Sequence, residues 1–258
     1  MHTKLIEISK KIRKFCLIET LEKNRGHLGG TFSCIEILVS LYYSNLFSLS
    51  TNNNLDKFIL SKGHACLGLY YILFDLGIIS KETLDSYGLD GGIGAQLDIN
   101  INGIDWNTGS LGHSIGVSTG LAIGQESGNY TITVIGDAEC YEGSVWESIV
   151  LAGEKNIENL IVIVDRNRLS VTEELGDDSF FKCYKDSLTS LGWHFNEIDG
   201  HNFDQIISSL KECKSINKPS LIIANTIKGK GVSFMENKKD WHHSVPNEKE
   251  VKLAVDSL

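Results

Sequence analysis

The sequence predicts an α/β fold with a doubly wound, mostly parallel sheet that carries helices on both faces. Short apolar runs rich in β-branched residues alternate with helical patterns along the chain, and the runs at 131–135 and 160–164 are almost uninterrupted. Such runs are typical of parallel strands that helices cover on both sides. The alternation continues without an internal repeat or a low-complexity linker, so we expect residues 1–258 to form a single domain.

The chain begins with a predicted amphipathic helix at 4–23, where the apolar positions approximate a helical stripe. Ser33 and Glu36 have capping-box spacing, which predicts a buried helix over 34–47. The elements expected next are, in order, a strand at 58–62, a helix at 65–77, a small helix that begins at Ser80 and Thr83, a glycine-rich loop at 90–103 and a glycine-rich helix at 108–124.

The two apolar runs enclose a helical stretch, so residues 131–164 form a strand, helix and strand unit. A right-handed crossover would set the two strands side by side, with their carboxyl ends at the same edge of the sheet. The elements expected after this unit are a helix at 178–191, a strand at 193–198, a turn at 199–202, a helix at 203–214, a strand at 220–226 and a loop at 227–237.

Composition and charge narrow the class of protein. The hydrophobic content of 41% and the charged content of 22% are ordinary for a globular protein. The net charge of -9 and the scattered Lys and Arg residues argue against binding to nucleic acid or to an acidic membrane. The six cysteines form no Cys-x-x-Cys pair and the first residues hold no signal-peptide core, so we expect reduced thiols and a cytoplasmic protein.

Polar residues follow both strands of the 131–164 unit. Asp137 and Asn167, thirty residues apart, should emerge together at the carboxyl edge of the sheet. Their carboxylate and amide oxygens suit Mg²⁺ or Ca²⁺, which would complete its shell with phosphate oxygens, a backbone carbonyl and water. Gly136 lets the backbone approach a ligand closely. The simpler interpretation of a lone Gly-Asp pair is a strand-end aspartate that caps a helix.

This pattern resembles the thiamine-diphosphate signature, in which Asn follows a Gly-Asp pair after about thirty residues. The segment at 142–147, Glu-Gly-Ser-Val-Trp-Glu, is similar to transketolase. Further segments resemble transketolase motifs in the same order, namely GHLGG at 26–30, LSKGHA at 60–65, TGSLG at 108–112 and KGKGV at 228–232. The resemblance covers nearly the whole chain, and several ordered motifs are more specific than one alone.

The resemblance implies a site for thiamine diphosphate and Mg²⁺, with Ca²⁺ as an alternative ion. The ion would be bound by Asp137, Asn167 and the backbone carbonyl of Leu169. The cofactor would contact His64, Gly109, Ser110, Leu111, Gly136, Asp137, Ala138, Glu139, Asn167 and His242.

The resemblance also implies catalytic and substrate-binding histidines. His27, His64 and His242 would transfer protons and contact oxyanions, since imidazole titrates near the working pH. His243 is the alternative to His242 if the local correspondence slips by one residue. The substrate would contact His27, His242 and Gln96, which stands where the family usually has a histidine.

Three further positions bear on this comparison. Glu142, a fourth catalytic candidate, matches a buried glutamate that links paired active sites, although a first-turn helix acid is its simpler interpretation. Ala138 occupies the site of a second glycine, where a methyl group should still permit binding of the cofactor. His113 stands where a glutamine is usual. The departures suggest a specialised relative that acts on an unusual sugar.

The implied activity is the reversible transfer of a two-carbon ketol unit from a ketose to an aldose, with sugars or sugar phosphates as substrates. Transketolases also need a second domain that binds the aminopyrimidine end of the cofactor, and their chains are much longer than 258 residues. The resemblance therefore implies the amino-terminal subunit of a split transketolase. It would be inactive alone and would work in a dimer of heterodimers with a separate carboxyl-terminal subunit.

Three other interpretations stay open. A related thiamine-diphosphate enzyme that decarboxylates a 2-keto acid would share the metal and diphosphate ligands, and it would release carbon dioxide from pyruvate. A noncatalytic partner subunit would retain the fold without the chemistry. A dinucleotide-binding domain uses similar strand and helix geometry, but no G-x-G-x-x-G follows a first strand here.

Overall fold

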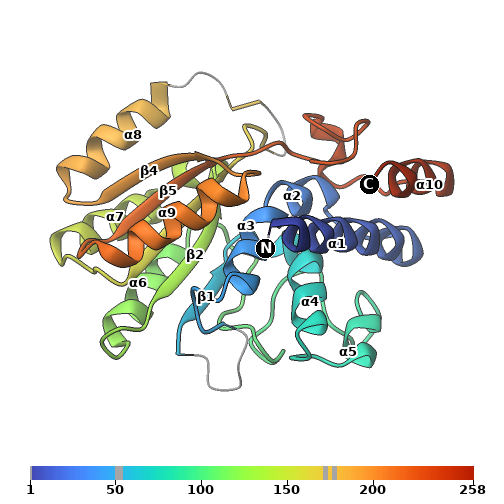
Figure 1. The fold of residues 1–258 in the computed structure, drawn as a ribbon, viewed down its shortest axis with the longest axis horizontal. Helices are drawn as coiled ribbons and strands as arrows, with labels where there is room; N and C mark the ends of the chain where they lie inside the picture. Colours follow the sequence, from blue (N-terminus) through green and yellow to red (C-terminus); the bar gives the residue numbers. More distant parts are fainter. Residues whose placement is uncertain (1, 50–54, 171–173, 176–178) are drawn as a thin grey trace.

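The computed structural model describes residues 2–49, 55–170, 174–175 and 179–258, and it has a five-stranded parallel sheet at its centre (Figure 1). The strands are β1 Lys57–Leu60, β2 Thr131–Gly136, β3 Leu160–Arg166, β4 His194–Asp199 and β5 Ser220–Asn225. They lie in the order β1-β2-β3-β5-β4, and every neighbouring pair is parallel. The predicted parallel sheet is confirmed.

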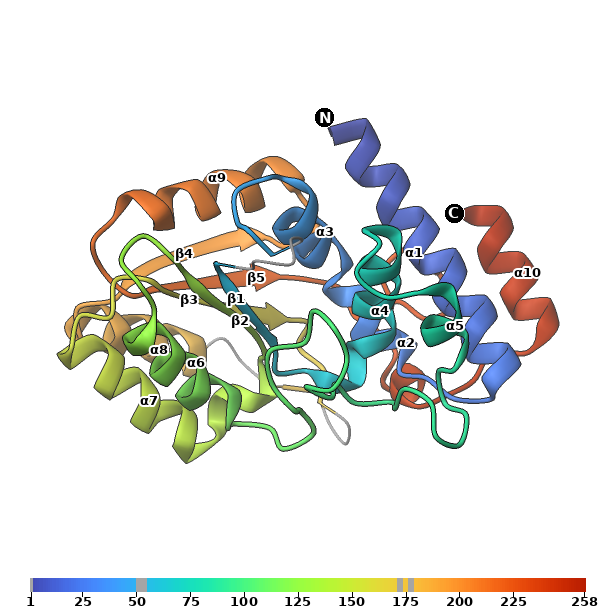
Figure 2. The same cartoon turned by 90° about the horizontal axis from the view of Figure 1, so that it is seen from below.

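Helices cover both faces of this sheet, as predicted. Figure 2 shows α3 (Ile35–Tyr43) and α9 (Phe203–Ser215) on one side and α6 (Ser114–Gly124), α7 (Gly143–Glu154) and α8 (Ser179–Ser190) on the other. None of the described helices is both long enough and apolar enough to span a membrane. The predicted helix start at residue 178 lies outside the described residues. The helices are α1 His2–Lys23, α2 Leu28–Ser33, α3 Ile35–Tyr43, α4 Cys66–Asp75, α5 Lys81–Asp85, α6 Ser114–Gly124, α7 Gly143–Glu154, α8 Ser179–Ser190, α9 Phe203–Ser215 and α10 Glu248–Ser257, with 3₁₀ turns η1 Gly63–Ala65, η2 Ala138–Tyr141 and η3 Lys239–His242.

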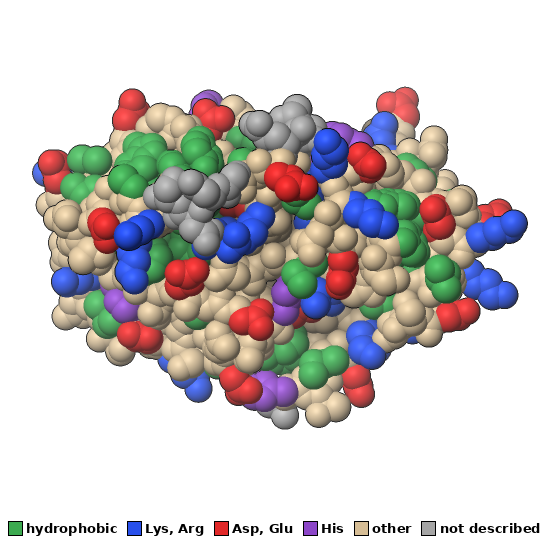
Figure 3. Space-filling model, turned by 90° about the horizontal axis from the view of Figure 1, so that it is seen from above, with side chains coloured by type: hydrophobic (Ala, Val, Ile, Leu, Met, Phe, Trp, Pro, Cys, Tyr) green, Lys and Arg blue, Asp and Glu red, His purple; other side chains and the backbone are tan. Residues whose placement is uncertain are grey.

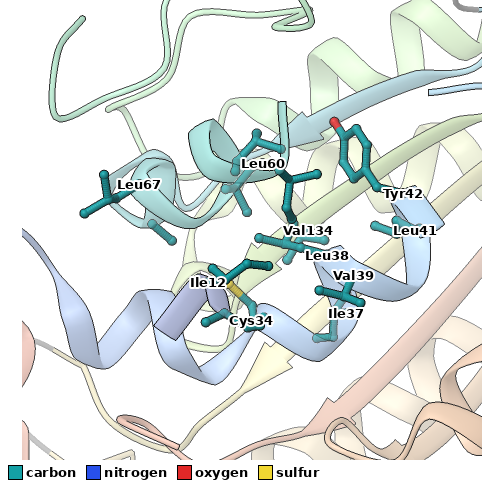
Figure 4. Packing of buried hydrophobic residues seen from close by; sticks show 14 of the residues in the cluster. Ile12, Cys34, Ile37, Leu38, Val39, Leu41, Tyr42, Leu60, Leu67 and Val134 are labelled. Carbon is teal, nitrogen blue, oxygen red and sulfur yellow. The ribbon is translucent and has the colours of Figure 1, made fainter. Parts of the chain in front are cut away.

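Each face of the sheet has its own hydrophobic core, because alternate residues of a strand point to opposite faces. In β3, Ile161 and Ile163 belong to the core beneath α3 and α9, whereas Val162 belongs to the core beneath α6, α7 and α8. Figure 4 shows part of the first core, where Leu38 of α3 lies against Val134 of β2. Burial on both sides explains why the strand sequences are apolar without alternation.

The predicted capping box at Ser33 and Glu36 is wrong. Ser33 is the last residue of α2, and no side chain caps α3. The buried helix predicted over 34–47 is nevertheless present as α3. The Ser33 hydroxyl instead donates to the Asp165 carboxylate at 2.5 Å. Glu36 pairs with Arg13 at 2.6 Å and with His201 at 2.8 Å. Burial opposes the charge of Glu36, but Arg13 and then His201 outweigh it and hold the pKa of Glu36 at about 2. Long-range partners thus override the local capping pattern.

Two other local predictions have different outcomes. The small helix at Ser80 is confirmed, since its side chain accepts a hydrogen bond from the Thr83 backbone as the cap of α5. The glycine-rich helix is shorter than predicted and begins at Ser114. The residues before it form a loop in which Gly109 and Gly112 have φ angles of 132° and 84°. Such angles lie outside the right-handed helical region.

Close packing of α7 against the segment before β4 requires a glycine at position 153. A Cβ atom there would lie 2.3 Å from the carbonyl oxygen of Leu191 and 3.1 Å from Nε1 of Trp193. Gly153→Ala should therefore lower the free energy of unfolding by about 1–3 kcal/mol, as measured by urea denaturation.

Gly120→Ala in α6 is the matched control, because a Cβ atom there meets nothing within 4 Å in the described structure. Its free energy of unfolding should stay constant or rise by up to about 1 kcal/mol. Equal losses in the two variants would contradict the steric explanation.

Candidate active site

The edge of the sheet after β2 and β3 brings the two predicted metal ligands together. Asp137 follows β2, and its backbone N–H donates to the Asp165 carbonyl of β3, two residues before Asn167. The buried Asp137 carboxylate accepts hydrogen bonds from the backbone N–H groups of Ala138 at 2.8 Å and Arg168 at 2.5 Å. Burial and the nearby Asp165 charge raise the pKa of Asp137 to about 6. A bound cation would stabilise a carboxylate in this environment.

Asn167 and Leu169 offer further oxygens at the same edge. The side-chain oxygen of Asn167 accepts a hydrogen bond from the Leu169 backbone at 3.2 Å, and its amide donates to Asp165 at 3.3 Å. The Leu169 carbonyl accepts from the ammonium group of Lys228 at 3.1 Å. Carboxylate, amide and carbonyl oxygens are thus available for a hard cation.

These groups lie in the wall of one cavity. The predicted site residues in that wall are His64, Leu111, Gly136, Asp137, Ala138, Glu139, Asn167, Leu169 and His242. The wall is completed by Gly30, Lys62, Ser170 and Lys228. The predicted residues outside it are His27, Gln96, Gly109, Ser110 and Glu142.

Glu139 joins the loops around this cavity. Its buried carboxylate accepts hydrogen bonds from the Ser61 hydroxyl, from the Gly112 backbone at 2.8 Å and from the Gly136 backbone at 3.2 Å. Burial raises the pKa of Glu139, although these donors oppose the rise. Through these hydrogen bonds, Glu139 holds the segments around Ser61, Gly112 and Gly136 together and so shapes the cavity.

A buried ion pair of Lys62 and Asp165 lies next to the predicted metal ligands. The Lys62 ammonium contacts the Asp165 carboxylate and also donates to the Gly30 carbonyl at 2.9 Å. Burial alone would lower the pKa of Lys62, but the Asp165 charge raises it overall. Asp165 also accepts from the hydroxyls of Ser33 and Thr226, so its charge is well compensated. Lys62 lines the cavity whereas Asp165 does not, so the pair presents its ammonium end to the cavity.

Lys228 connects the carbonyl of Leu169, a predicted metal ligand, to His242. Its ammonium group lies 3.1 Å from the Leu169 carbonyl, 3.3 Å from the Ser170 carbonyl and 3.0 Å from Nδ1 of His242. Burial, reinforced by repulsion from Lys62, lowers the pKa of Lys228 to about 8. The Lys228 ammonium group therefore lies between the Leu169 and Ser170 carbonyls on one side and the His242 ring on the other.

The three predicted catalytic histidines lie together. The ring centroids of His27 and His64 are 5.4 Å apart, those of His27 and His242 are 5.6 Å apart, and those of His64 and His242 are 5.3 Å apart. Burial, with repulsion from His243, lowers the pKa of His27 to about 4, and burial with repulsion from Lys228 lowers that of His242 to about 3. Burial also takes the pKa of His64 well below its usual value. All three rings are therefore neutral at neutral pH.

His27 and His242 should remain neutral from about pH 5 to about pH 8, a range in which histidine usually titrates. Imidazole ¹⁵N chemical shifts measured across this range should show little change for either ring. His27→Gln and His242→Gln variants would assign the signals. A titration midpoint near the ordinary value of 6.5 for either ring would contradict the expectation.

The remaining predicted positions lie outside the cavity wall. Gln96 packs against Gly63, just after β1, since its Oε1 atom is 2.3 Å from where a Cβ atom on that glycine would lie. Glu142, implied to be buried near an interface, is exposed in this single chain at the start of α7. Ser110 is exposed in the loop before α6, and the exposed His113 provides no side-chain cap for that helix.

Sequence reasoning missed Lys62, Lys228 and Asp165. Both lysines belong to the segments 60–65 and 228–232, so membership in these motifs was the signal that could have found them. Asp165 is the aspartate that precedes Arg and Asn at the end of β3. Its burial had no local signal, because aspartate is rarely buried without a partner and its partner is 103 residues away.

The fold and this edge define a class of protein. Parallel α/β domains bind ligands at the carboxyl ends of their strands, and this edge carries buried carboxylates, lysines and neutral imidazoles, as cofactor-dependent enzymes do. Within that class, residues 6–258 match the family described as transketolase, thiamine diphosphate binding domain. The chain belongs to this family.

Its relatives include single subunits and complete enzymes. The chain is 34% identical to one subunit of the apulose-4-phosphate transketolase of Phocaeicola vulgatus, over 99% of this chain and 94% of that protein. It is 35% identical to the 6-deoxy-6-sulfo-D-fructose transketolase subunit SqwG of a Clostridium species, over 96% and 93% of the two chains. The transketolase structure from Campylobacter jejuni superimposes with a TM-score of 0.87 at 25% identity, over 98% of this chain and 42% of that one. The subunits are matched almost end to end, the complete transketolase over less than half.

Proposed function

We propose that this chain holds the diphosphate end of thiamine diphosphate in a split transketolase, and that a separate carboxyl-terminal subunit completes each active site. The observation that carries this proposal is the cavity in which Asp137, Asn167 and the Leu169 carbonyl meet His64 and His242. The end-to-end match to transketolase subunits supports the division into two chains.

Asp137, Asn167 and Leu169 would hold a Mg²⁺ ion, and the chemistry of their oxygen atoms fits that ion. The raised pKa of Asp137 indicates a carboxylate whose charge lacks compensation, and the Leu169 carbonyl already faces a cationic group, that of Lys228. With the amide oxygen of Asn167, these groups offer three protein oxygens of the kind that Mg²⁺ prefers, and the ion would in turn help to hold the diphosphate. Ca²⁺, which tolerates more flexible geometry, could replace Mg²⁺.

When bound, thiamine diphosphate supplies the capacity to stabilise a carbanion, which side chains lack. Lys62 and Lys228 would offset the charge of the diphosphate. His64 and His242 in the cavity wall, with His27 beside them, are neutral rings that can donate or accept a proton at a sugar hydroxyl. The protein thus provides charge, orientation and proton transfer.

The loop before α6 completes the proposed cofactor site. Leu111 contributes to the cavity wall, and Gly109 and Ser110 precede it in the same exposed loop. Gln96, beside this loop, would present an amide to the donor sugar where a histidine would offer a titratable ring. We therefore expect donor recognition by hydrogen bonds at this position, without proton transfer.

Exposed apolar side chains on α6, on α7 and on the segments that precede these helices support a partner subunit. They are Leu111, Ile123, Tyr141, Val150 and Leu151, with exposed fractions from 37% to 57%. A partner that covers them would also bury Glu142, as its proposed role between paired sites requires. We propose a dimer of heterodimers in the cytoplasm.

The surface charge bears on the class of substrate. Figure 3 shows basic and acidic side chains interspersed on one face, which fits small sugar or sugar-phosphate substrates better than nucleic acid.

The decisive experiment mixes this chain with the carboxyl-terminal subunit of a split transketolase, thiamine diphosphate and Mg²⁺, and assays a panel of ketose donors. Ketol transfer should need both chains and should be lost on chelation of the metal ion. Full activity of this chain alone would overturn the division into subunits. Carbon dioxide release from pyruvate, without ketol transfer, would identify a 2-keto acid decarboxylating enzyme instead.

A further inference from the structure

Three histidines bring ring nitrogens together beside the cofactor cavity. One nitrogen from each of His27, His242 and His243 can be chosen so that all three lie within 4.8 Å of one another. The ring centroid of His243 is 4.4 Å from that of His27 and 4.6 Å from that of His242. His27 immediately precedes α2, whereas His242 and His243 end the η3 turn, so distant segments of the chain form the cluster.

The ring nitrogens of this cluster have few competing partners. Nδ1 of His27 is buried and has no hydrogen-bond partner among the described residues. Across the same residues, no hydrogen bond is found to the ring of His243, which is exposed. A buried polar atom without a partner costs free energy, which a ligand can recover.

We propose that His27, His242 and His243 form a binding site for a transition metal ion such as Zn²⁺, separate from the proposed Mg²⁺ site. Imidazole nitrogens suit Zn²⁺, Co²⁺ and Ni²⁺, whereas Mg²⁺ prefers oxygen ligands. Three histidines with a fourth position open to water or substrate form a known zinc geometry. Asp137, Asn167 and the Leu169 carbonyl offer oxygen atoms, so these three groups have the opposite preference.

The three ring nitrogens must move closer together to bind one metal ion. Zn–N distances of about 2.0–2.1 Å place the nitrogens of a tetrahedral site about 3.4 Å apart. The nitrogens must therefore close from the 4.8 Å limit by up to about 1.4 Å. His243 is exposed, so its side chain is free to make most of this movement.

Lys228 sets an upper limit on the affinity. Its ammonium group donates to Nδ1 of His242 at 3.0 Å. If Nε2 of His242 binds the metal ion, Nδ1 carries the ring proton, so Lys228 must turn toward its Leu169 and Ser170 carbonyl partners. Because this adjustment costs a hydrogen bond, we expect micromolar binding of Zn²⁺ and no permanent structural ion.

A metal ion in this cluster would exclude the sugar donor, because it would occupy His27 and His242. This consequence rests on the proposed function, whereas the binding site itself does not. Zn²⁺ should raise the apparent KM for the donor in the reconstituted complex, and EDTA followed by Mg²⁺ should reverse the effect.

Calorimetric titration of the untagged chain with Zn²⁺, in excess Mg²⁺, tests the site directly. One ion should bind per chain, and Co²⁺ should give the visible absorption of a four- or five-coordinate nitrogen site. Replacing a residue that only hydrogen-bonds a metal ligand typically lowers metal affinity by roughly 10–100-fold. Removing a metal ligand itself should cost more, so His243→Ala should weaken Zn²⁺ binding by at least about 100-fold. His2→Ala, at a remote histidine, and Asp137→Asn should retain binding.

His243→Cys provides a second measurement, because a thiolate is also a zinc ligand and should restore affinity. Circular dichroism would verify that each variant is folded. Absence of Zn²⁺ binding, or equal binding by the wild-type chain and His243→Ala, would overturn the proposal. If Zn²⁺ binds as expected but the reconstituted complex transfers no ketol unit, the proposed function fails and the metal site stands.

Discussion

Asp137→Asn should weaken Mg²⁺-dependent binding of thiamine diphosphate to the reconstituted complex by at least about 100-fold, more than loss of an outer-shell partner costs. The substitution removes the only charged oxygen among the three proposed metal ligands while keeping the shape of the side chain. Equilibrium titration of the cofactor in saturating Mg²⁺ measures the change. Asp90→Asn, at an exposed loop position, is the control and should bind as the wild type does.

The same variant should change the pH dependence of stability. The pKa of Asp137 rises from 3.8 to about 6 on folding, so the folded chain binds more protons than the unfolded chain in this range. The wild-type chain, free of cofactor, should therefore lose stability from this group as the pH rises between these values. Asp137→Asn should lack that contribution.

For the cofactor titration, undiminished binding of thiamine diphosphate by Asp137→Asn would exclude Asp137 as the metal ligand.

Lys62→Met should lower the free energy of unfolding by about 3–5 kcal/mol, because it leaves the buried Asp165 carboxylate without its cationic partner. Hydroxyl donors from Ser33 and Thr226 would remain, but they carry no charge. Urea denaturation of the isolated chain at neutral pH measures the loss. This effect would be several times that of an average substitution.

Two further variants test whether the unpaired charge of Asp165 causes the loss of stability in Lys62→Met. Lys62→Met combined with Asp165→Asn should be more stable than Lys62→Met alone, since no unpaired charge is then buried. Lys81→Met breaks the exposed pair of Lys81 and Asp85 in α5 and should cost less than about 0.5 kcal/mol. Similar losses for Lys62→Met and Lys81→Met would contradict a special role for burial.

The sheet could be predicted because each strand and helix is indicated by the pattern of its own residues. The runs at 131–135 and 160–164 are apolar on both faces, and the helices between strands have their own periodicity. Helix α10 was not predicted, because its apolar stripe is narrow and only Val251 and Ala254 are buried. The capping pattern at Ser33 failed because its side chain is used in a contact with a residue 132 positions away.

The site was predictable where residue type and strand position coincide. Asp137 and Asn167 follow adjacent parallel strands, so topology alone brings them to one edge. Lys62 and Lys228 could not be placed in the same way, since lysine is usually exposed and their partners are distant in sequence. The low pKa of His242 likewise depends on burial and on Lys228, which no local pattern reveals.

The three contacts of Glu139 have a consequence for the order of folding. Its carboxylate joins Ser61, 78 residues earlier, to Gly112, 27 residues earlier, and to Gly136 beside it. Ser61 follows β1 and Glu139 follows β2, so pairing of these parallel strands closes the intervening loop and brings the two residues to one edge of the sheet. The proposed cofactor cavity should therefore mature after β1 and β2 have paired, and slow protection of the Gly112 amide from hydrogen exchange would report its completion.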